Sequence, residues 1–283
     1  MDLKEIVSST RAYNFHSHTQ FCDGRAEMAQ FVEAAIKEGY LYYGFTPHSP
    51  IPFNSPCNMA ESQVEEYFNE FNRLKELYSE RINLYLSMEI DYLGDAWGAS
   101  SEYFQNLPLD YRLSSVHFIP VQSGEMMVDI DGRPDSFIRK MHDFFNDDIQ
   151  YVVDTFYCQT LRMIEAGGFD LLGHFDKIGF NASHFKPGIE SEPWYQRHVD
   201  DIIEAVKGSD LVVEVNTKAW LPPVNATSEQ TAIYSHRLFP SESNIGKLIR
   251  AGIPLAVNSD AHFTERISAG RDAAFRIIDS LKG

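Results

Sequence analysis

The chain has 283 residues, 43% of them hydrophobic, which is ordinary for a globular protein with a sizeable core, and a formal net charge of −17. This acidity argues against a nucleic-acid partner, because nucleic-acid binders usually present a basic face to the phosphates. Residues 1–10 lack the apolar stretch of a signal peptide, no run approaches the ~20 apolar residues of a membrane span, and the three cysteines are scattered. We therefore expect a cytoplasmic protein with no membrane partner.

Short apolar or aromatic runs alternate with longer amphipathic segments, a pattern typical of successive β/α units. The predicted strands are Tyr13–His18, Tyr42–His48, Ile82–Asp91, Arg112–Ile119, Phe169–Asp176, Asp210–Thr217 and Ile253–His262. The predicted helices are Met28–Glu38, Glu61–Glu80, Tyr151–Ala166, Trp194–Lys207 and Ser241–Ala251. Seven units predict one α/β domain over residues 1–283, a TIM-like (β/α)7 barrel. The long connections near 120–148 and 218–240 follow strands and should lie over the barrel mouth.

Histidines and acids gather near the carboxyl ends of the predicted strands, where parallel barrels build their active sites. The set is His16, His18, His48, Glu89, His117, His174, Asp260 and His262. Residues two apart on a strand point to the same face, so His16 with His18, and Asp260 with His262, can each present two ligands together.

Imidazole and carboxylate groups suit divalent zinc, iron or manganese, and eight ligands exceed one tetrahedral site, which predicts two or three ions. Taken singly, each residue has an ordinary interpretation. A histidine in an apolar strand is usually a hydrogen-bonded core residue, and Asp260 could cap a helix. The joint pattern favours the metal site, because so many polar groups would be an odd filling for a core.

Six motifs follow in order along the chain. They are FHSHTQFCDG (Phe15–Gly24), TPHS (Thr46–Ser49), MEID (Met88–Asp91), SVHF (Ser115–Phe118), GHFD (Gly173–Asp176) and NSDAH (Asn258–His262). Together they resemble the PHP (polymerase and histidinol phosphatase) family of metal-dependent phosphoesterases, over essentially the whole chain. The resemblance implies a distorted seven-stranded β/α barrel, in agreement with the count of units.

The resemblance also implies three metal positions. His16, His18, Glu89 and Asp260 would hold the first ion, and Glu89 would bridge to a second ion bound by His117 and His174. His48 and His262 would hold the third, joined by Asp23. Asp91, on the same strand face as Glu89, is a rival ligand, and Pro47 stands where the family commonly has an acid before the histidine. We predict that His117, Asp260 and His262 are catalytic as well as metal-binding.

Within the family, GFTPHSPIP (Gly44–Pro52) and SVHFIPVQSGEMMVDID (Ser115–Asp131) resemble the histidinol-phosphatase branch. This implies hydrolysis of L-histidinol phosphate, a small phosphate ester of histidine biosynthesis, by a metal-bridging hydroxide. Lys177, Asn216 and Arg266 are the predicted substrate contacts, and Asp176 and Asn216 are candidates to orient ligands. The alternatives are a PHP phosphoesterase for another small ester or nucleotide, and a non-catalytic metal-binding module.

Overall fold

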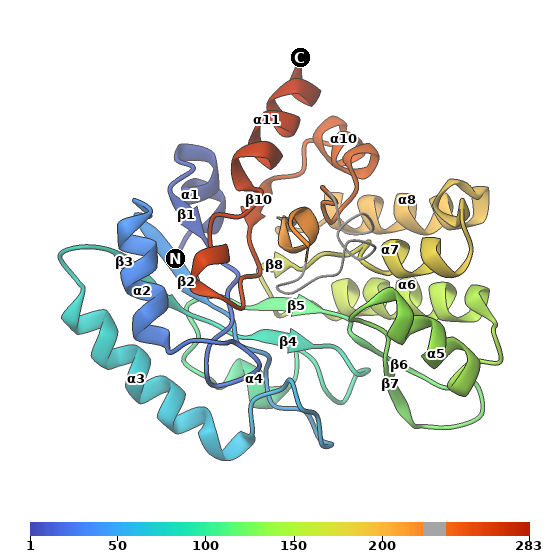
Figure 1. The fold of residues 1–283 in the computed structure, drawn as a ribbon, viewed down its shortest axis with the longest axis horizontal. Helices are drawn as coiled ribbons and strands as arrows, with labels where there is room; N and C mark the ends of the chain where they lie inside the picture. The colour runs from blue at the N-terminus through green and yellow to red at the C-terminus, as the bar shows by residue number, and fades with distance from the viewer. Residues whose placement is uncertain (223–235) are drawn as a thin grey trace.

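A computed structural model describes residues 1–222 and 236–283 (Figure 1). Its strands are β1 (Tyr13–Asn14), β2 (Tyr42–Phe45), β3 (Asn83–Leu86), β4 (Glu89–Asp91), β5 (Leu113–Ser115), β6 (Phe118–Pro120), β7 (Met127–Asp129), β8 (Leu171–Leu172), β9 (Val212–Asn216) and β10 (Leu255–Asn258). Its α-helices are α1 (Leu3–Ser9), α2 (Met28–Lys37), α3 (Val64–Leu77), α4 (Glu102–Gln105), α5 (Pro134–Phe144), α6 (Ile149–Ala166), α7 (Ile178–Phe185), α8 (Pro193–Lys207), α10 (Glu242–Arg250) and α11 (Arg271–Lys282). Short 3₁₀ turns are η1 (Glu61–Gln63), η2 (Ile189–Ser191), η3 (Lys218–Trp220) and η4 (Thr264–Arg266).

The strands form two parallel sheets, in the orders β1-β2-β3 and β10-β9-β8-β5-β4. Two single parallel bridges join the sheets, one from Ser17 after β1 to Ala261 after β10 and one from His48 after β2 to Glu89 in β4. Figure 1 accordingly places the first strand, in blue, beside the last, in red, with the helices around the outside. The predicted α/β barrel is therefore confirmed, in a distorted form whose ring is completed by two isolated bridges.

The helices pack on the ring through apolar faces that the sequence spacing dictates. In α2, Met28, Phe31, Val32 and Ala35 are buried, the spacing of one helical face. The longest helix, α6, starts where the side chain of Asp148 accepts a hydrogen bond from the Tyr151 amide. Among the described residues, no helix is long and apolar enough to cross a membrane.

Two predicted strands are broken, and both breaks lie beside the candidate ligands. The predicted Ile82–Asp91 strand is two strands, β3 paired with β2 and β4 paired with β5. At this break the Tyr67 hydroxyl of α3 lies within hydrogen-bond distance of two backbone carbonyl oxygens, those of Phe45 (3.2 Å) and Ser87 (2.7 Å).

The predicted Arg112–Ile119 strand likewise ends at Ser115. Beyond it, β6 turns away and pairs antiparallel with β7, and these two strands lie together with α5 at one side of the barrel (Figure 1). Val116 and the candidate ligand His117 lie between β5 and β6 and belong to neither strand. The helices α1, α4, α5, α7 and α11 were not among the predicted helices. The predicted connection 218–240 falls largely on residues 223–235, outside the described residues.

Candidate metal centre

The candidate ligands converge at one end of the barrel because the strands stop pairing just before them. The last paired residues of β1, β2, β5, β8 and β10 precede His16, His48, His117, His174 and Asp260 by two or three positions. Past the last paired residue of each strand, these short segments bring their side chains together at one end of the barrel. Glu89, the first residue of β4, is the exception and takes part in the bridge to His48.

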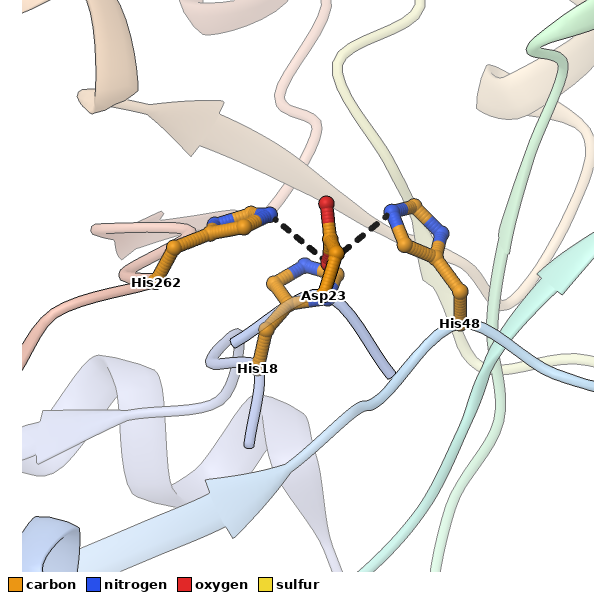
Figure 2. Close-up of side chains that lie close together, drawn as sticks. All are labelled: His18, Asp23, His48 and His262. Atoms are coloured by element: carbon orange, nitrogen blue, oxygen red, sulfur yellow. Dashed lines mark ion pairs between the residues drawn. The ribbon is translucent and has the colours of Figure 1, made fainter. Parts of the chain in front are cut away.

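One group surrounds the carboxylate of Asp23, which lies in the loop after β1. Figure 2 shows the rings of His18, His48 and His262, from three different strand ends, facing this side chain. Asp23 Oδ1 lies 3.2 Å from His262 Nε2, 3.7 Å from His18 Nδ1 and 4.0 Å from His48 Nε2. Burial raises the pKa of Asp23, but the three imidazoles outweigh it and hold the pKa well below its usual value. Asp23 Oδ1 is buried yet accepts no hydrogen bond of good geometry. A buried carboxylate oxygen without a hydrogen bond is costly, and binding a cation would remove that cost.

A second group consists of His16, His18 and Asp260. The Nε2 atoms of the two histidines lie 3.2 Å apart. Asp260 Oδ1 lies 3.0 Å from His18 Nε2 and 3.7 Å from His16 Nε2. All three residues are at most 2% exposed, so these polar atoms face one another with little contact with solvent.

Glu89 connects the groups, because its two oxygens face different sets of imidazoles. Oε2 lies 3.2 Å from both His16 Nε2 and His48 Nδ1. Oε1 lies 3.4 Å from His117 Nε2 and 3.0 Å from His174 Nε2. Each oxygen of Glu89 therefore faces two imidazoles, and a carboxylate placed in this way could contact two cations. Glu89 with His48 and His117 also forms a third group whose ligand atoms lie within 4.8 Å of one another.

Partners behind the rings fix which nitrogen of each histidine faces the centre. His16 Nδ1 lies 2.7 Å from Glu214 Oε1, and His117 Nδ1 lies 2.7 Å from Asp91 Oδ1. Each ring donates through Nδ1–H and turns the Nε2 lone pair inward, as metal-binding histidines do. Asp91 therefore positions His117 and is not a rival to Glu89.

The carboxylates make the centre attractive to positive charge. Burial lowers the pKa of His16 and of His117, but neighbouring carboxylates outweigh it and raise both, His117 to about 9. Burial instead dominates at His18, where it combines with nearby His262 and His48 to lower the pKa well below its usual value. The donor set of imidazoles and carboxylates, with the orphaned Asp23 oxygen, fits divalent zinc, iron or manganese.

The division into sites differs in detail from the sequence-based assignment. His18 contacts Asp260 through Nε2 and faces Asp23 through Nδ1, so it stands between the first and third expected positions. His48 likewise reaches Glu89 as well as Asp23, and Pro47 in front of it leaves this placement intact. The eight strand-end ligands and Asp23 are all brought together, but the three sets share members.

A cavity of about 580 Å³ opens directly onto the centre. Its lining includes ligands, the aromatic rings of Phe118, Phe180, Phe239 and Phe263, the carboxylates of Asp129 and Asp131, and the cations Arg25, Arg133, Lys177, Lys218 and Arg266. Residues after β6 thus supply Asp129, Asp131 and Arg133 to the cavity wall. Residues 218–222, after β9, supply Lys218 and Leu221.

Two of the three predicted substrate contacts line the cavity. Arg266 lines the cavity, as does Lys177, whose Nζ lies 2.6 Å from Asp131 Oδ2. Asn216 is instead fully buried behind Asp260, to which its amide donates at 3.1 Å, so it supports a ligand and does not face the cavity.

Asp176, which was expected to orient a ligand, is not beside the candidate ligands. It accepts hydrogen bonds from the Ser241 amide and the Asn244 side chain at the start of α10, because α7 carries the chain away after His174.

Sequence reasoning missed two residues of the centre, Glu214 and Lys218. Glu214 is a fully buried acid inside the apolar run Leu211–Val215, a signal that could have found it. Lys218 follows that strand as an ordinary loop lysine, and no pattern distinguishes it.

The PHP domain family matches residues 14–218, nearly three quarters of the chain. The chain belongs to this family. As a PHP protein it is 23% identical over 273 residues to a protein named probable histidinol-phosphatase from Deinococcus radiodurans, covering 94% of this chain and 90% of the relative. It is also 29% identical over 127 residues to the histidinol-phosphatase of Bacillus subtilis, covering 41% of this chain and 47% of that one.

Solved structures support the PHP fold. A candidate histidinol phosphatase from Listeria monocytogenes superimposes with a TM-score of 0.76 at 19% identity, covering 92% of this chain and 99% of that one. The histidinol phosphate phosphatase of Lactococcus lactis, solved with zinc, L-histidinol and phosphate, gives 0.63 at 17% identity, covering 96% and 94%. At these identities the likeness establishes the distorted barrel shared with these proteins.

Proposed function

We propose that this PHP protein is a metal-dependent phosphatase that hydrolyses L-histidinol phosphate to L-histidinol and phosphate. The observation that carries the proposal is the placement of three connected groups of candidate ligands, which share His18 and His48, beside one cavity. Relatives that match over most of the chain carry the name histidinol-phosphatase. A phosphoric monoester hydrolase is the activity that accounts for both.

The ligands would be shared among two or three ions. His16, His18, Glu89 and Asp260 would hold one, Glu89 with His117 and His174 a second, and Asp23 with His48 and His262 a third. Bound divalent ions would activate water at neutral pH and neutralise the charge of the phosphate. His117, Asp260 and His262 remain the proposed catalytic residues, with zinc, iron and manganese as the candidate metals.

The chain itself keeps the centre ready by orienting its ligands. Glu214 holds His16 and Asp91 holds His117, each by a 2.7 Å contact to Nδ1. Ser115 donates to Glu89 Oε1 at 2.8 Å and so fixes the bridging carboxylate. Such outer partners keep the lone pairs directed inward and reduce the rearrangement needed when ions and substrate bind.

The cavity also suits the leaving group of the proposed substrate. L-histidinol carries an ammonium group and an imidazole ring. Asp129, which also accepts from Lys140 Nζ at 2.9 Å, offers a carboxylate for the first, and Phe118 offers an aromatic face for the second. Lys177 and Arg266, which line the same cavity, are proposed to contact the phosphate. A cytoplasmic location and a single-domain organisation remain predictions.

The test is turnover by purified protein loaded separately with zinc, manganese or iron. The substrates would be histidinol phosphate, a nucleoside monophosphate and a phosphodiester, with Asp260→Asn as the inactive variant and the exposed Asp135→Asn as its matched control. We expect hydrolysis of histidinol phosphate by the wild type and the control, and loss of metal and turnover in Asp260→Asn. Faster hydrolysis of the nucleotide would favour another small ester, diester cleavage alone would refute the phosphatase, and metal binding without turnover would favour a non-catalytic module.

A further inference from the structure

The backbone of Lys218 is held by Asn216, which also hydrogen-bonds to the candidate metal ligand Asp260. It is the first residue of η3, two residues after the end of β9. Its backbone N–H donates to Asn216 Oδ1 at 2.9 Å, and Asn216 Nδ2 donates to Asp260 Oδ2 at 3.1 Å. A single buried amide therefore fixes both the backbone of Lys218 and the carboxylate of Asp260.

The side chain of Lys218 runs from the cavity opening to the ligand cluster. Its Nζ lies 3.2 Å from Asp260 Oδ1 and 3.4 Å from His262 Nε2. The Lys218 side chain is 36% exposed and that of Asp260 is 2% exposed, so the ammonium group sits at the boundary between solvent and centre. An ammonium group can only donate, so His262 presents its Nε2 lone pair to it. That lone pair is the one a metal would use.

The charge of Lys218 is balanced differently from that of the other cavity lysine. Lys177 Nζ lies 2.6 Å from Asp131 Oδ2, a carboxylate that is not one of the candidate metal ligands. Lys218 instead shares Asp260 with His16 and His18. A divalent ion bound to Asp260 would take up the charge of that carboxylate. The Lys218 ammonium would then face the cavity with its positive charge uncompensated.

We propose that Lys218 binds the phosphoryl group of the substrate and supplies a positive charge beside Asp260 and His262 in addition to that of the metal ions. The proposal rests on the phosphatase function above. A phosphate monoester carries about −1.5 to −2 charge at pH 7 and three acceptor oxygens, for which a lysine is a suitable point charge. Inorganic phosphate, the product, has the same chemistry and should bind the same group.

The experiment compares Lys218→Met and Lys218→Arg with Lys4→Met, a control that removes a surface lysine paired with Asp210 outside the cavity. Metal content is measured by mass spectrometry, and binding of inorganic phosphate to the zinc-loaded full chain by calorimetry. Steady-state kinetics on histidinol phosphate completes the set.

We expect full metal content in all variants and a dissociation constant for phosphate raised about 10- to 100-fold in Lys218→Met, the usual weight of a charged hydrogen bond. KM for histidinol phosphate should rise with it. Lys218→Arg should keep part of the affinity, because it keeps the charge, and Lys4→Met should match the wild type.

Two results would overturn the proposal. One is unchanged phosphate affinity in Lys218→Met at full metal content. The other is loss of metal from that variant, since Lys218 would then act by holding Asp260 or His262. If the wild type binds phosphate but fails to hydrolyse histidinol phosphate, the proposed substrate is wrong, and the phosphate titration still decides the role of Lys218.

Discussion

Replacing Glu214 with glutamine tests whether the outer partners of the ligands control the metal centre. The substitution changes one oxygen to NH₂ with almost no change of volume. Glu214 Oε1 is 2.7 Å from His16 Nδ1 and 3.2 Å from Asn258 Nδ2, and Oε2 is 3.1 Å from both the His174 amide nitrogen and Asn216 Nδ2. All four partners point donors at the carboxylate.

Neither Asn258 nor Asn216 can flip its side-chain amide to present an oxygen to the new NH₂ group. The Oδ1 atom of Asn258 already accepts from the Phe15 amide, and that of Asn216 accepts from the Lys218 amide. With its NH₂ toward the His174 amide and Asn216 Nδ2, glutamine meets two donors. With its NH₂ toward His16, it meets the Asn258 donor and requires His16 Nδ1 to become an acceptor. Each buried polar group left without a partner costs about 1–3 kcal/mol. We expect a loss of roughly 2–6 kcal/mol in the unfolding free energy of the metal-free protein. Metal affinity should fall about 10- to 100-fold, because His16 loses the group that orients it.

The assay is chemical denaturation of the metal-free protein, with zinc affinity measured by competition against a chelator. Glu204→Gln is the matched control, because Glu204 is on α8 with a side chain 78% exposed. If Glu214→Gln matched this control in both stability and zinc affinity, the argument that the outer partners orient the ligands would be refuted.

Three other perturbations have defined outcomes. His117→Ala should lower kcat by more than the 10- to 100-fold typical of an outer partner, yet change the unfolding free energy by only about 1 kcal/mol, and near-wild-type turnover would contradict the ligand role. Gly173→Ala places a Cβ against Ser115 Oγ, which holds Glu89, so it should cost about 1–3 kcal/mol and weaken zinc binding. Gly208→Ala, whose Cβ meets nothing closer than 3.7 Å, is its control. Removing metal with a chelator should abolish turnover reversibly and lower Tm, because bound ions stabilise only the folded state; turnover that survives full chelation would exclude a metal-dependent reaction.

The barrel and its candidate ligands could be predicted because both produce local patterns in the sequence. Apolar runs mark the strands, and HSH and SDAH place pairs of ligands at strand ends. The break between Leu86 and Glu89 could not be predicted, because a single serine, Ser87, between two apolar residues is no signal of a strand end. It depends on Tyr67, brought in from a helix some twenty residues earlier.

The sequence identified the candidate ligands individually, but it did not predict how they are grouped in space. His18 and His48 were assigned to separate ions, but distances between strand ends decide which groups share a nitrogen or an oxygen. The roles of Glu214 and Lys218 are long-range in the same sense. Each is set by contacts to residues more than forty positions away, Glu214 with His16 and Lys218 with Asp260.

The bridge between Ser17 and Ala261 joins the first strand of the ring to the last, and candidate ligands flank it on both sides. A nascent chain leaving the ribosome would present His16 and His18 long before Asp260 and His262 exist. The metal positions that use Asp260 or His262 can therefore be completed only after the last strand is made, since domains begin to form from the amino-terminal side during synthesis. A fragment that stops before β10 would lack half of this ligand set together with the bridge, so stoichiometric metal content would report that the whole ring has been made.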